Sequence, residues 1–212
     1  MQKGWWVTQI EKADQKGGGE IACENLAFWG AFAMGQIKNA EPVKMLVGLL
    51  AARKELFDAV RMRLEQVWGP VDLQSEIMDF DYTRYYDNEM GRPLYRRFLS
   101  FEKRIDPGLL SGIKVATNAL EDELAVNGRR QVNIDPGYLT PAKLVLATTK
   151  DRAHRIYLGK GIYAEVTLLY QGGAFRELPW TYPDYRSEKY RAFFTRVREI
   201  CLRQQKEVEK RE

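Results

Sequence analysis

QVNIDPGYLTPAKLVLATTKDRAHRIYLGKGIYAEVTLL, residues 131–169, contains more polar corners between apolar segments than any other part of the chain. The corners are Asp135-Pro136-Gly137, Thr149-Lys150-Asp151 and Gly159-Lys160-Gly161. Apolar runs that alternate with turn residues are typical of short strands joined by tight turns. Because the corners carry titratable side chains, the stretch predicts the rim of a pocket mounted on a packed core.

The first half of this stretch leaves two interpretations open. Residues 132–134 predict a short strand that ends in a turn at Asp135-Pro136-Gly137. Thr140-Pro141 then has the pattern of a helix N-cap followed by proline, which predicts a short helix over residues 142–147. A strand over residues 144–148 is the alternative, since so short an apolar run fits both.

The second half of the stretch predicts a hairpin. Residues 155–158 and 162–170 flank Gly159-Lys160-Gly161, which has the composition of a tight turn. A further turn at Gly172-Gly173 leads to a short segment at residues 175–178. After a proline-rich loop, an apolar stripe predicts the last helix, formed by Tyr190, Phe193, Phe194, Val197, Ile200 and Cys201.

Toward the N-terminus, regular elements are predicted from residue 42 onward. They are a strand over 43–50, a helix that ends at Trp68-Gly69-Pro70, a strand over 72–80, an acidic aromatic loop over 79–91, a strand over 95–105 and a helix that starts at Asp106-Pro107. The last helix has a predicted buried stripe of Leu109, Ile113, Ala116, Leu120 and Leu124.

The order of these elements predicts an α+β fold. The first six match the βαββαβ order of a ferredoxin-like unit. We therefore expect a ferredoxin-like βαββαβ core with an added hairpin and a C-terminal helix. Its sheet is expected to be mostly antiparallel, with helices on one face.

Composition and charge exclude several classes of protein. The chain has 212 residues and a formal net charge of +4, without the basic stripe of nucleic-acid binders, so a nucleic-acid partner is not expected. Its two cysteines, Cys23 and Cys201, lie far apart, which argues against a disulfide framework and a cysteine zinc site. No apolar run approaches the roughly 20 residues that span a bilayer. We expect a cytoplasmic protein with no membrane partner.

Three parts of the chain are expected. Residues 1–36 show no sustained periodicity and predict a translated leader before a true start at Met34, or else a disordered or docking extension. A signal peptide is the third interpretation, but its apolar run would be short and its approach is interrupted by polar residues. Residues 37–205 predict a single α+β domain, and residues 206–212 predict a polar tail.

Several segments resemble one family. They are EPVKMLVGLL, FDYTRYYDNEMG, the strand from Arg97 to Asp106, VNIDPGY, KLVLATTKD, HRIYLGKGIYAEVTL and LPWTYPDYR. On these segments, which extend from about residue 37 to about residue 201, the chain is similar to the prokaryotic domain-of-unknown-function family numbered 4416. The resemblance implies a start near Met34, where members begin, and it implies no established activity.

Some members of that family carry a GTP-binding label, which the residues support poorly. A P-loop requires G-x-x-x-x-G-K-[ST], whose amides hold phosphates. Gly159-Lys160-Gly161-Ile162 lacks that frame, and Thr149-Lys150-Asp151 matches a guanine-recognition tetrapeptide only in part. A P-loop GTPase is therefore not expected, and nucleotide binding by another geometry stays open.

The candidate catalytic residues are Asp135, His154 and Glu165. Asp135, between a predicted strand end and a helix start, would be a base, a metal ligand or part of an anion site, or it merely caps a turn. His154 is the only histidine, so it is either a lone general acid–base or a structural residue. Strand alternation turns Glu165 away from the core positions, and a covered face there would raise its pKa.

Basic and aromatic residues are candidates for ligand binding. The set is Arg97, Tyr138, Lys150, Asp151, Arg155, Lys160 and Tyr163. The basic members would hold an anionic group, and the alternative is that their turns are only turns. A lid is expected from the two aromatic loops, with Asp81, Tyr85, Tyr86, Glu89, Tyr182, Asp184 and Tyr185 as its residues. The alternative role of these loops is packing on the sheet edge.

These residues predict a protein that binds, or transforms, a small phosphate-bearing or other anionic ligand such as a nucleotide. Mg²⁺ is a candidate ion for its carboxylates. An RNA-associated ferredoxin-like module is one alternative. A non-catalytic partner-binding domain is the other, and the sequence decides neither whether the protein is an enzyme nor its oligomeric state.

Overall fold

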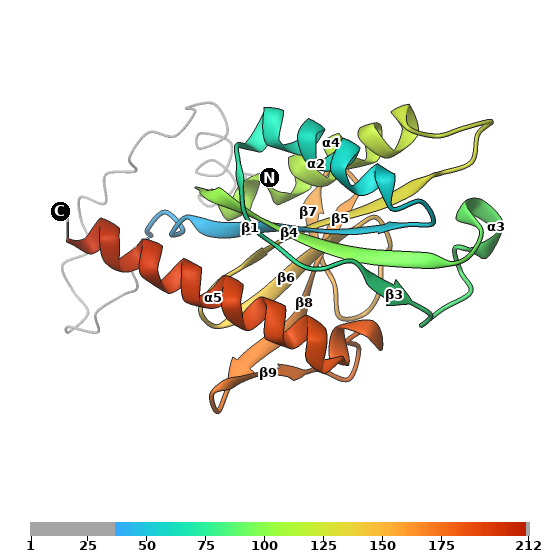
Figure 1. Ribbon diagram of the computed structural model, residues 1–212. Helices are drawn as coiled ribbons and strands as arrows, with labels where there is room; N and C mark the ends of the chain where they lie inside the picture. Colours follow the sequence, from blue (N-terminus) through green and yellow to red (C-terminus); the bar gives the residue numbers. More distant parts are fainter. Residues whose placement is uncertain (1–36, 211–212) are drawn as a thin grey trace, which may run out of the picture. The chain divides into compact units, whose positions relative to one another are not determined.

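The computed structural model describes residues 37–210, and the leader or disordered extension expected at residues 1–36 lies outside them. The elements are β1 (Val43–Ala51), α2 (Glu55–Trp68), β2 (Val71–Gln74), β3 (Met78–Phe80), α3 (Asp87–Met90), β4 (Leu94–Ile105), the 3₁₀ turn η1 (Pro107–Leu109), α4 (Leu110–Glu123), β5 (Val132–Leu139), β6 (Lys143–Thr148), β7 (Ile156–Gly159), β8 (Ile162–Gln171), β9 (Ala174–Glu177), the 3₁₀ turn η2 (Asp184–Arg186) and α5 (Glu188–Glu209). Figure 1 shows their arrangement.

One sheet organises the described part of the chain. Its nine strands follow the order β2-β4-β1-β5-β6-β8-β7, with β3 paired to β4 and β9 paired to β8. The pairings are antiparallel. With four α-helices in the same residues, this confirms the α+β class and the mostly antiparallel sheet. None of the helices in residues 37–210 has both the length and the apolar character that a membrane crossing requires.

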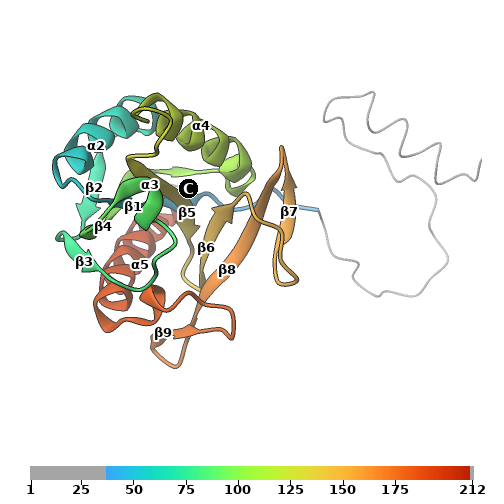
Figure 2. The same cartoon turned by 90° about the vertical axis from the view of Figure 1, so that its right-hand side faces the viewer.

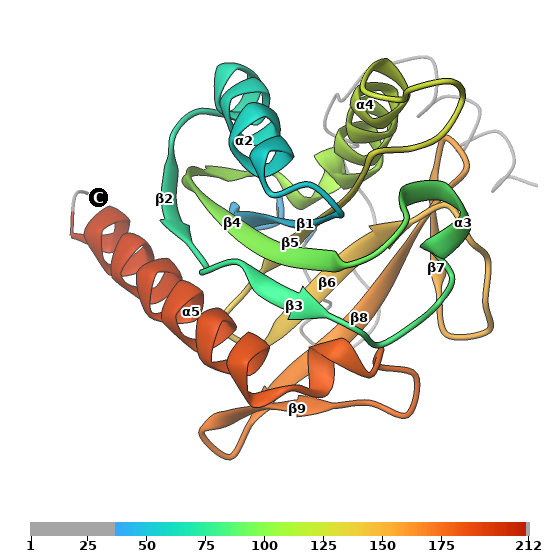
Figure 3. The same cartoon turned by 45° about the vertical axis from the view of Figure 1, so that its right-hand side comes forward.

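Helices cover both faces of the sheet, so the expectation of one covered face is wrong. The central strand β1 shows the reason, because consecutive side chains of a strand point to opposite faces. Met45, Val47 and Leu49 pack with residues of α2 and α4. Leu46 belongs instead to the cluster that contains Phe194 and its neighbours on α5. Figure 3 shows α2 and α4 above the sheet and α5 below it.

Residues 143–148 form the strand β6, so the short helix expected over residues 142–147 is wrong and the alternative strand is right. The Thr140 hydroxyl accepts hydrogen bonds from the amides of Ala142 and Lys143 at 3.2 and 3.1 Å. A Thr-Pro pair can therefore close a hairpin with the kind of hydrogen bond that would also cap a helix. Pairing with both β5 and β8 then makes the segment a strand.

Asp135-Pro136-Gly137 lies inside β5 and not in a turn, which corrects the second expectation for this stretch. β5 pairs with β1 along its whole length, but it pairs with β6 only from Gly137 onward. Pro136 has no amide hydrogen to offer a neighbouring strand. Gly137 is a point of close approach, because a Cβ there would lie 2.3 Å from the Val145 carbonyl oxygen. The strands diverge from this point, and Figure 1 shows β6 and β8 running steeply across β1 and β4.

Smaller departures concern element boundaries. The strand expected over residues 72–80 is two strands, β2 and β3, which both pair with β4. Leu109 is exposed and Leu110 is buried in its place, because Asp106 caps the turn η1 before α4 begins. The polar residues from Lys206 continue α5 to its end. None of these changes alters the position of the cavity described below.

Gly137→Ala should destabilise the fold, because its Cβ would lie 2.3 Å from the Val145 carbonyl oxygen and 2.7 Å from Leu146 Cδ2. Backbone cannot move aside cheaply, so we expect urea denaturation to show a loss of about 2–3 kcal/mol in the free energy of unfolding. Gly112→Ala on α4 is the matched control, since its Cβ would meet nothing nearer than Lys160 Nζ at 3.7 Å. The control should gain up to about 1 kcal/mol. Equal effects of the two changes would contradict the close approach.

Candidate functional site

A cavity of about 810 Å³ lies where β5 and β6 diverge. Residues of β4, β5, β6, β8 and α4 line it, together with the loops that contain α3 and η2. Figure 2 shows how β6, β8 and β7 turn away from β1 and β5. Its lining among the described residues includes six carboxylates and five basic side chains, so charge dominates the surface that a ligand would meet.

Two side chains of α4 form hydrogen bonds with backbone groups of β5 where β5 has no neighbouring strand on that side. The Ile134 amide donates a hydrogen bond to Glu121 Oε1 at 2.7 Å, and Lys114 Nζ donates to the Ile134 carbonyl oxygen at 2.7 Å. A buried strand without such partners would keep a donor and an acceptor unpaired. The two side chains therefore take the place of a neighbouring strand. Burial raises the pKa of Glu121, although Lys114 at 3.7 Å partly opposes the shift.

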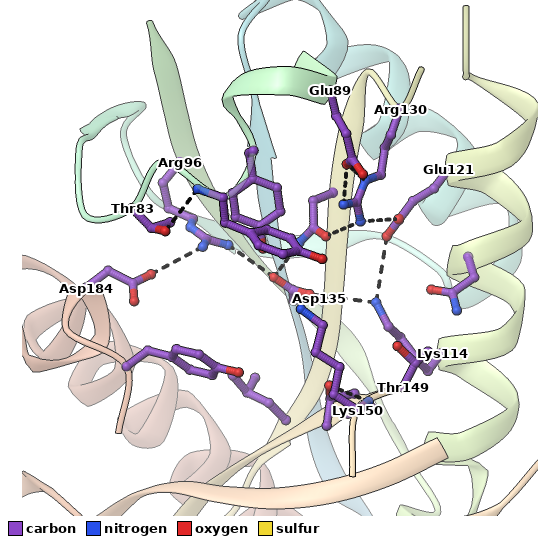
Figure 4. A pocket seen from close by; sticks show the side chains of 18 of the residues that line it. Thr83, Glu89, Arg96, Lys114, Glu121, Arg130, Asp135, Thr149, Lys150 and Asp184 are labelled. Atoms are coloured by element: carbon purple, nitrogen blue, oxygen red, sulfur yellow. Dashed lines mark hydrogen bonds and ion pairs between the residues drawn. The ribbon is translucent and has the colours of Figure 1, made fainter. Parts of the chain in front are cut away.

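A row of alternating charges crosses the cavity floor, and we call it the charge row (Figure 4). Its members, in spatial order, are Glu89, Arg130, Glu121, Lys114, Asp135, Arg96 and Asp184. Neighbouring members lie at most 3.7 Å apart, so each charge has an opposite charge beside it. Removing one member would take one opposite charge away from each of its neighbours, so the members of the row depend on one another.

Arg96 and Asp135 meet across the central strand. They lie on β4 and β5, and between them lies Gly48 of β1, where a Cβ would be 3.2 Å from Arg96 Nη1. Arg96 is 3 % exposed, and its guanidinium also lies 3.2 Å from Asp184 and 5.1 Å from the ring centre of Phe80. Burial alone would lower the pKa of Arg96, but acidic neighbours, Asp184 and Asp135 among them, raise it. The guanidinium therefore stays charged inside the protein.

Two loops, which contain α3 and η2, line the cavity and include most of the expected lid residues. Asp81 is outside the lining and pairs with Arg92. Arg130 lies 5.5 Å from the ring centre of Tyr86, and Lys150 Nζ lies 4.1 Å from that of Tyr85. Cation–π contacts thus tie the first loop to the cavity wall. The expected lid residues that line the cavity are Tyr85, Tyr86, Glu89, Tyr182, Asp184 and Tyr185.

Glu165, on β8, lines the cavity, and its carboxylate is held in place by His154 and Arg155. Its Oε2 lies 3.0 Å from His154 Nε2 and accepts a hydrogen bond from Arg155 Nε at 2.9 Å. The His154 ring stacks on Trp180, with ring centres 5.1 Å apart. Arg155 also donates to the Tyr182 hydroxyl at 2.7 Å. His154 is not among the residues that line the cavity, and it contacts one of them, Glu165. Arg155 connects this wall to the second loop through Tyr182.

Part of the predicted ligand-binding set lies outside the cavity. Arg97 points to the opposite face from Arg96 and pairs with Asp58 at 3.2 Å. Lys160, in the turn between β7 and β8, lies beside Gly112 of α4. The residues outside the lining are Arg97, Tyr138, Asp151, Lys160 and Tyr163. The predicted catalytic and binding residues that do line the cavity are Asp135, Lys150, Arg155 and Glu165.

The anion site expected at Asp135 depended on a helix that starts just after it, and that part of the expectation is wrong. β5 and β6 follow one another there without a helix between them. The free amides of a helix N-terminus therefore do not face Asp135. Its carboxylate instead lies 3.5 Å from Arg96 Nη1 and 3.7 Å from Lys114 Nζ.

Reasoning from sequence missed four members of the charge row. Lys114 and Glu121 are seven positions apart on α4 and share its buried face with Thr117. Opposite charges at that helical spacing face the same side, so the pair was a readable signal. Arg96 had no comparable signal, because alternation groups it with Phe98 without telling which face is inside. The members missed are Arg96, Lys114, Glu121 and Arg130.

Among residues 37–210, no group of three or more His, Cys, Asp or Glu side chains is arranged to hold a metal ion. In the charge row the acidic residues are separated by basic ones, as at Glu121, Lys114 and Asp135. The Mg²⁺ considered from the sequence therefore gains no support from the donor set, and no cofactor is assigned to the cavity.

Comparisons with known proteins give a family and no activity. The model of one family, described as a domain of unknown function (DUF4416), matches residues 41–200. No curated protein and no solved structure matches the chain.

The pair Lys114–Glu121 should show strong coupling, because each partner is 7 % exposed at the side chain. We expect Lys114→Met and Glu121→Gln each to lower the free energy of unfolding by about 3 kcal/mol, since either takes one of two opposite charges away from a buried partner and removes or weakens a hydrogen bond to the Ile134 backbone. The double variant should lose clearly less than the sum, measured by urea denaturation. Arg63–Glu123, with side chains 49 % and 55 % exposed, is the matched exposed pair and should couple by less than about 1 kcal/mol. Additive effects at Lys114 and Glu121 would contradict their role at the edge of β5.

Asp184→Asn should change how stability depends on pH. Burial raises the pKa of Asp184, although Arg96 opposes the shift. The contribution of a carboxyl with a raised pKa is complete below its ordinary value of 3.8 and is lost as the pH rises through the raised value. We expect urea denaturation at pH values rising from 3.8 to show that the free energy of unfolding falls less steeply in the variant than in the wild type. Asp58→Asn, at an exposed carboxylate, controls for the loss of one charge, and an unchanged slope in Asp184→Asn would contradict this assignment.

Proposed function

Since the chain belongs to the DUF4416 family, whose description assigns no function, we propose from the cavity that the protein binds a small anionic ligand there, such as a nucleotide. A volume of about 810 Å³ is within the range of small-molecule sites. The walls are held by hydrogen bonds and ion pairs on several elements, so little ordering would be needed on binding. These features support a preformed site for a phosphate-bearing or similar molecule.

The observation that carries the proposal is the environment of Lys150. It extends from the end of β6 into the cavity (Figure 4) and lies over the Tyr85 ring at 4.1 Å. The ion pairs formed within residues 37–210 do not include Lys150. An ammonium group in a cavity without a carboxylate beside it attracts an anion. The other four basic side chains of the cavity each have a carboxylate partner: Arg96, Lys114, Arg130 and Arg155.

Aromatic side chains support the same proposal. Phe80, Tyr86 and Tyr182 also line the cavity, and rings of this kind can stack on a planar group such as a nucleobase. Burial raises the pKa of Tyr86, so its hydroxyl stays a neutral hydrogen-bond donor. The lid role of the two loops belongs to this proposal. Asp135 and Glu165 line the space where acid–base chemistry on a ligand would occur, and we propose binding without assigning a reaction.

We also propose that the half of the sheet from β1 to β5 is a ferredoxin-like unit. The strand order β2-β4-β1-β5 and the antiparallel pairing of neighbours support this reading. An RNA-associated module of that kind stacks bases on an exposed sheet. Here α2 and α4 pack on one face and α5 packs on the other, which disfavours the RNA alternative. The buried free thiol of Cys201 supports a cytoplasmic location as part of the proposal.

Lys150→Ala should weaken nucleotide binding, whereas Lys160→Ala should not. Both lysines were candidates from the sequence, but only Lys150 lines the cavity, so the two variants remove the same charge at different places. We expect adenosine 5′-monophosphate to bind the Lys150 variant about tenfold more weakly in isothermal titration. The affinity of the wild type should also fall as salt rises. Equal affinities of the two variants and the wild type would contradict the proposed site.

A further inference from the structure

Glu165 lines the cavity, and one of its two carboxylate oxygens lacks a hydrogen-bond partner among the described residues. Glu165 is 2 % exposed, and its Oε2 is engaged by His154 and Arg155. Its Oε1 is buried and has no partner within the described part of the chain. Buried polar atoms are satisfied with few exceptions, and a charged acceptor left alone is costly. An N–H donor from outside the chain would give this oxygen the partner that the described residues do not supply.

The carboxylate of Glu165 cannot easily turn to find a partner in the protein. Arg155 Nε donates to Oε2 at 2.9 Å, and the same guanidinium donates through Nη1 to the Lys150 carbonyl oxygen at 2.7 Å. His154, which contacts the same oxygen, is stacked on Trp180 with an interplanar angle of 10°. The indole of Trp180 is in turn held by a hydrogen bond to the Val166 carbonyl oxygen at 2.8 Å. The direction in which Oε1 points is thus set by the wall behind it.

Arg155 also connects this acceptor to Lys150, the basic residue of the cavity for which residues 37–210 supply no ion-pair partner. It contacts the side chain of Glu165 and the backbone of Lys150, so it joins the two residues on one wall of the cavity. A ligand that places an anionic group at Lys150 therefore meets a hydrogen-bond acceptor at a fixed position. A site built to accept a hydrogen bond rejects an analogue that lacks the donor.

We propose that Glu165 Oε1 accepts a hydrogen bond from an N–H group of the ligand and so determines specificity. The ligand is then an anion that also carries an amino or amide group, with a nucleotide bearing an exocyclic amine as one such molecule. This inference rests on the proposed function, because Lys150 has to hold the anionic group. His154 and Arg155 are positioning residues in this account, since they act through Glu165.

Glu165→Gln separates this role from a purely structural one. Arg155 Nε donates to the oxygen at the Oε2 position, so the glutamine should place its carbonyl oxygen there. Its NH₂ group then occupies the position of Oε1, where a donor replaces an acceptor. The variant keeps the size of the side chain and its hydrogen bond to Arg155, while the preference for an N–H donor should disappear.

The test is isothermal titration of the full chain with two probes that differ in one amino group. These are adenosine 5′-monophosphate and purine riboside 5′-monophosphate, in which hydrogen replaces the 6-amino group. The wild type should bind the amino-bearing probe at least about tenfold more tightly. Glu165→Gln should bind the two probes within about threefold of each other, while Lys160→Ala should keep the wild-type preference.

The outcomes distinguish this inference from the proposed function. Equal binding of both probes by the wild type overturns the role of Glu165 and leaves anion binding at Lys150 standing. A preference that persists in Glu165→Gln overturns it as well. If neither probe nor inorganic phosphate binds the wild type, both proposals fall. Thermal melting checks that the variant folds, and if it does not, the comparison of the two probes on the wild type decides alone.

Discussion

The hydrogen bonds that complete the open edge of β5 are the constraint on which the rest of the structure depends. Pairing with β6 ends at Gly137, so the amide and carbonyl of Ile134 need other partners. Glu121 and Lys114 supply them from α4, at the expense of burying two opposite charges. Buried charges require further partners of their own. The cavity and the charges that line it follow from this one interruption of the sheet.

The charge row consists of the further ion pairs that the two buried charges, Glu121 and Lys114, form with their neighbours. Glu121 engages Arg130, and Lys114 engages Asp135, which in turn lies beside Arg96. Replacing buried ion pairs by apolar packing is often neutral or stabilising, so the row is a weak source of stability. Its effect is to hold a polar wall in place around the cavity. Lys150 stands apart from the row, because residues 37–210 place no carboxylate within ion-pair distance of it, and the proposed anion site is based on this difference.

Local patterns predicted most of the elements, because alternation and helical spacing depend on neighbouring residues. They failed where one local signature suits several structures. Thr140-Pro141 suits a helix start or a hairpin, and Asp135-Pro136-Gly137 suits a turn or a strand that parts from its neighbour. Partners distant in the chain decided both, namely β1 and β8. Arg96 and Arg97 show the same limit, since alternation puts them on opposite faces but does not say which face the cavity occupies.

A crystal structure of the full chain grown with adenosine 5′-monophosphate tests the central claim most directly. The account predicts that the Ile134 amide and carbonyl are bonded to Glu121 and Lys114, and that the nucleotide lies between β5 and β6. Its phosphate should contact Lys150 Nζ, and its amino group should contact Glu165 Oε1. A sheet in which β6 pairs with β5 back to Ile134, or a nucleotide bound elsewhere, would contradict it.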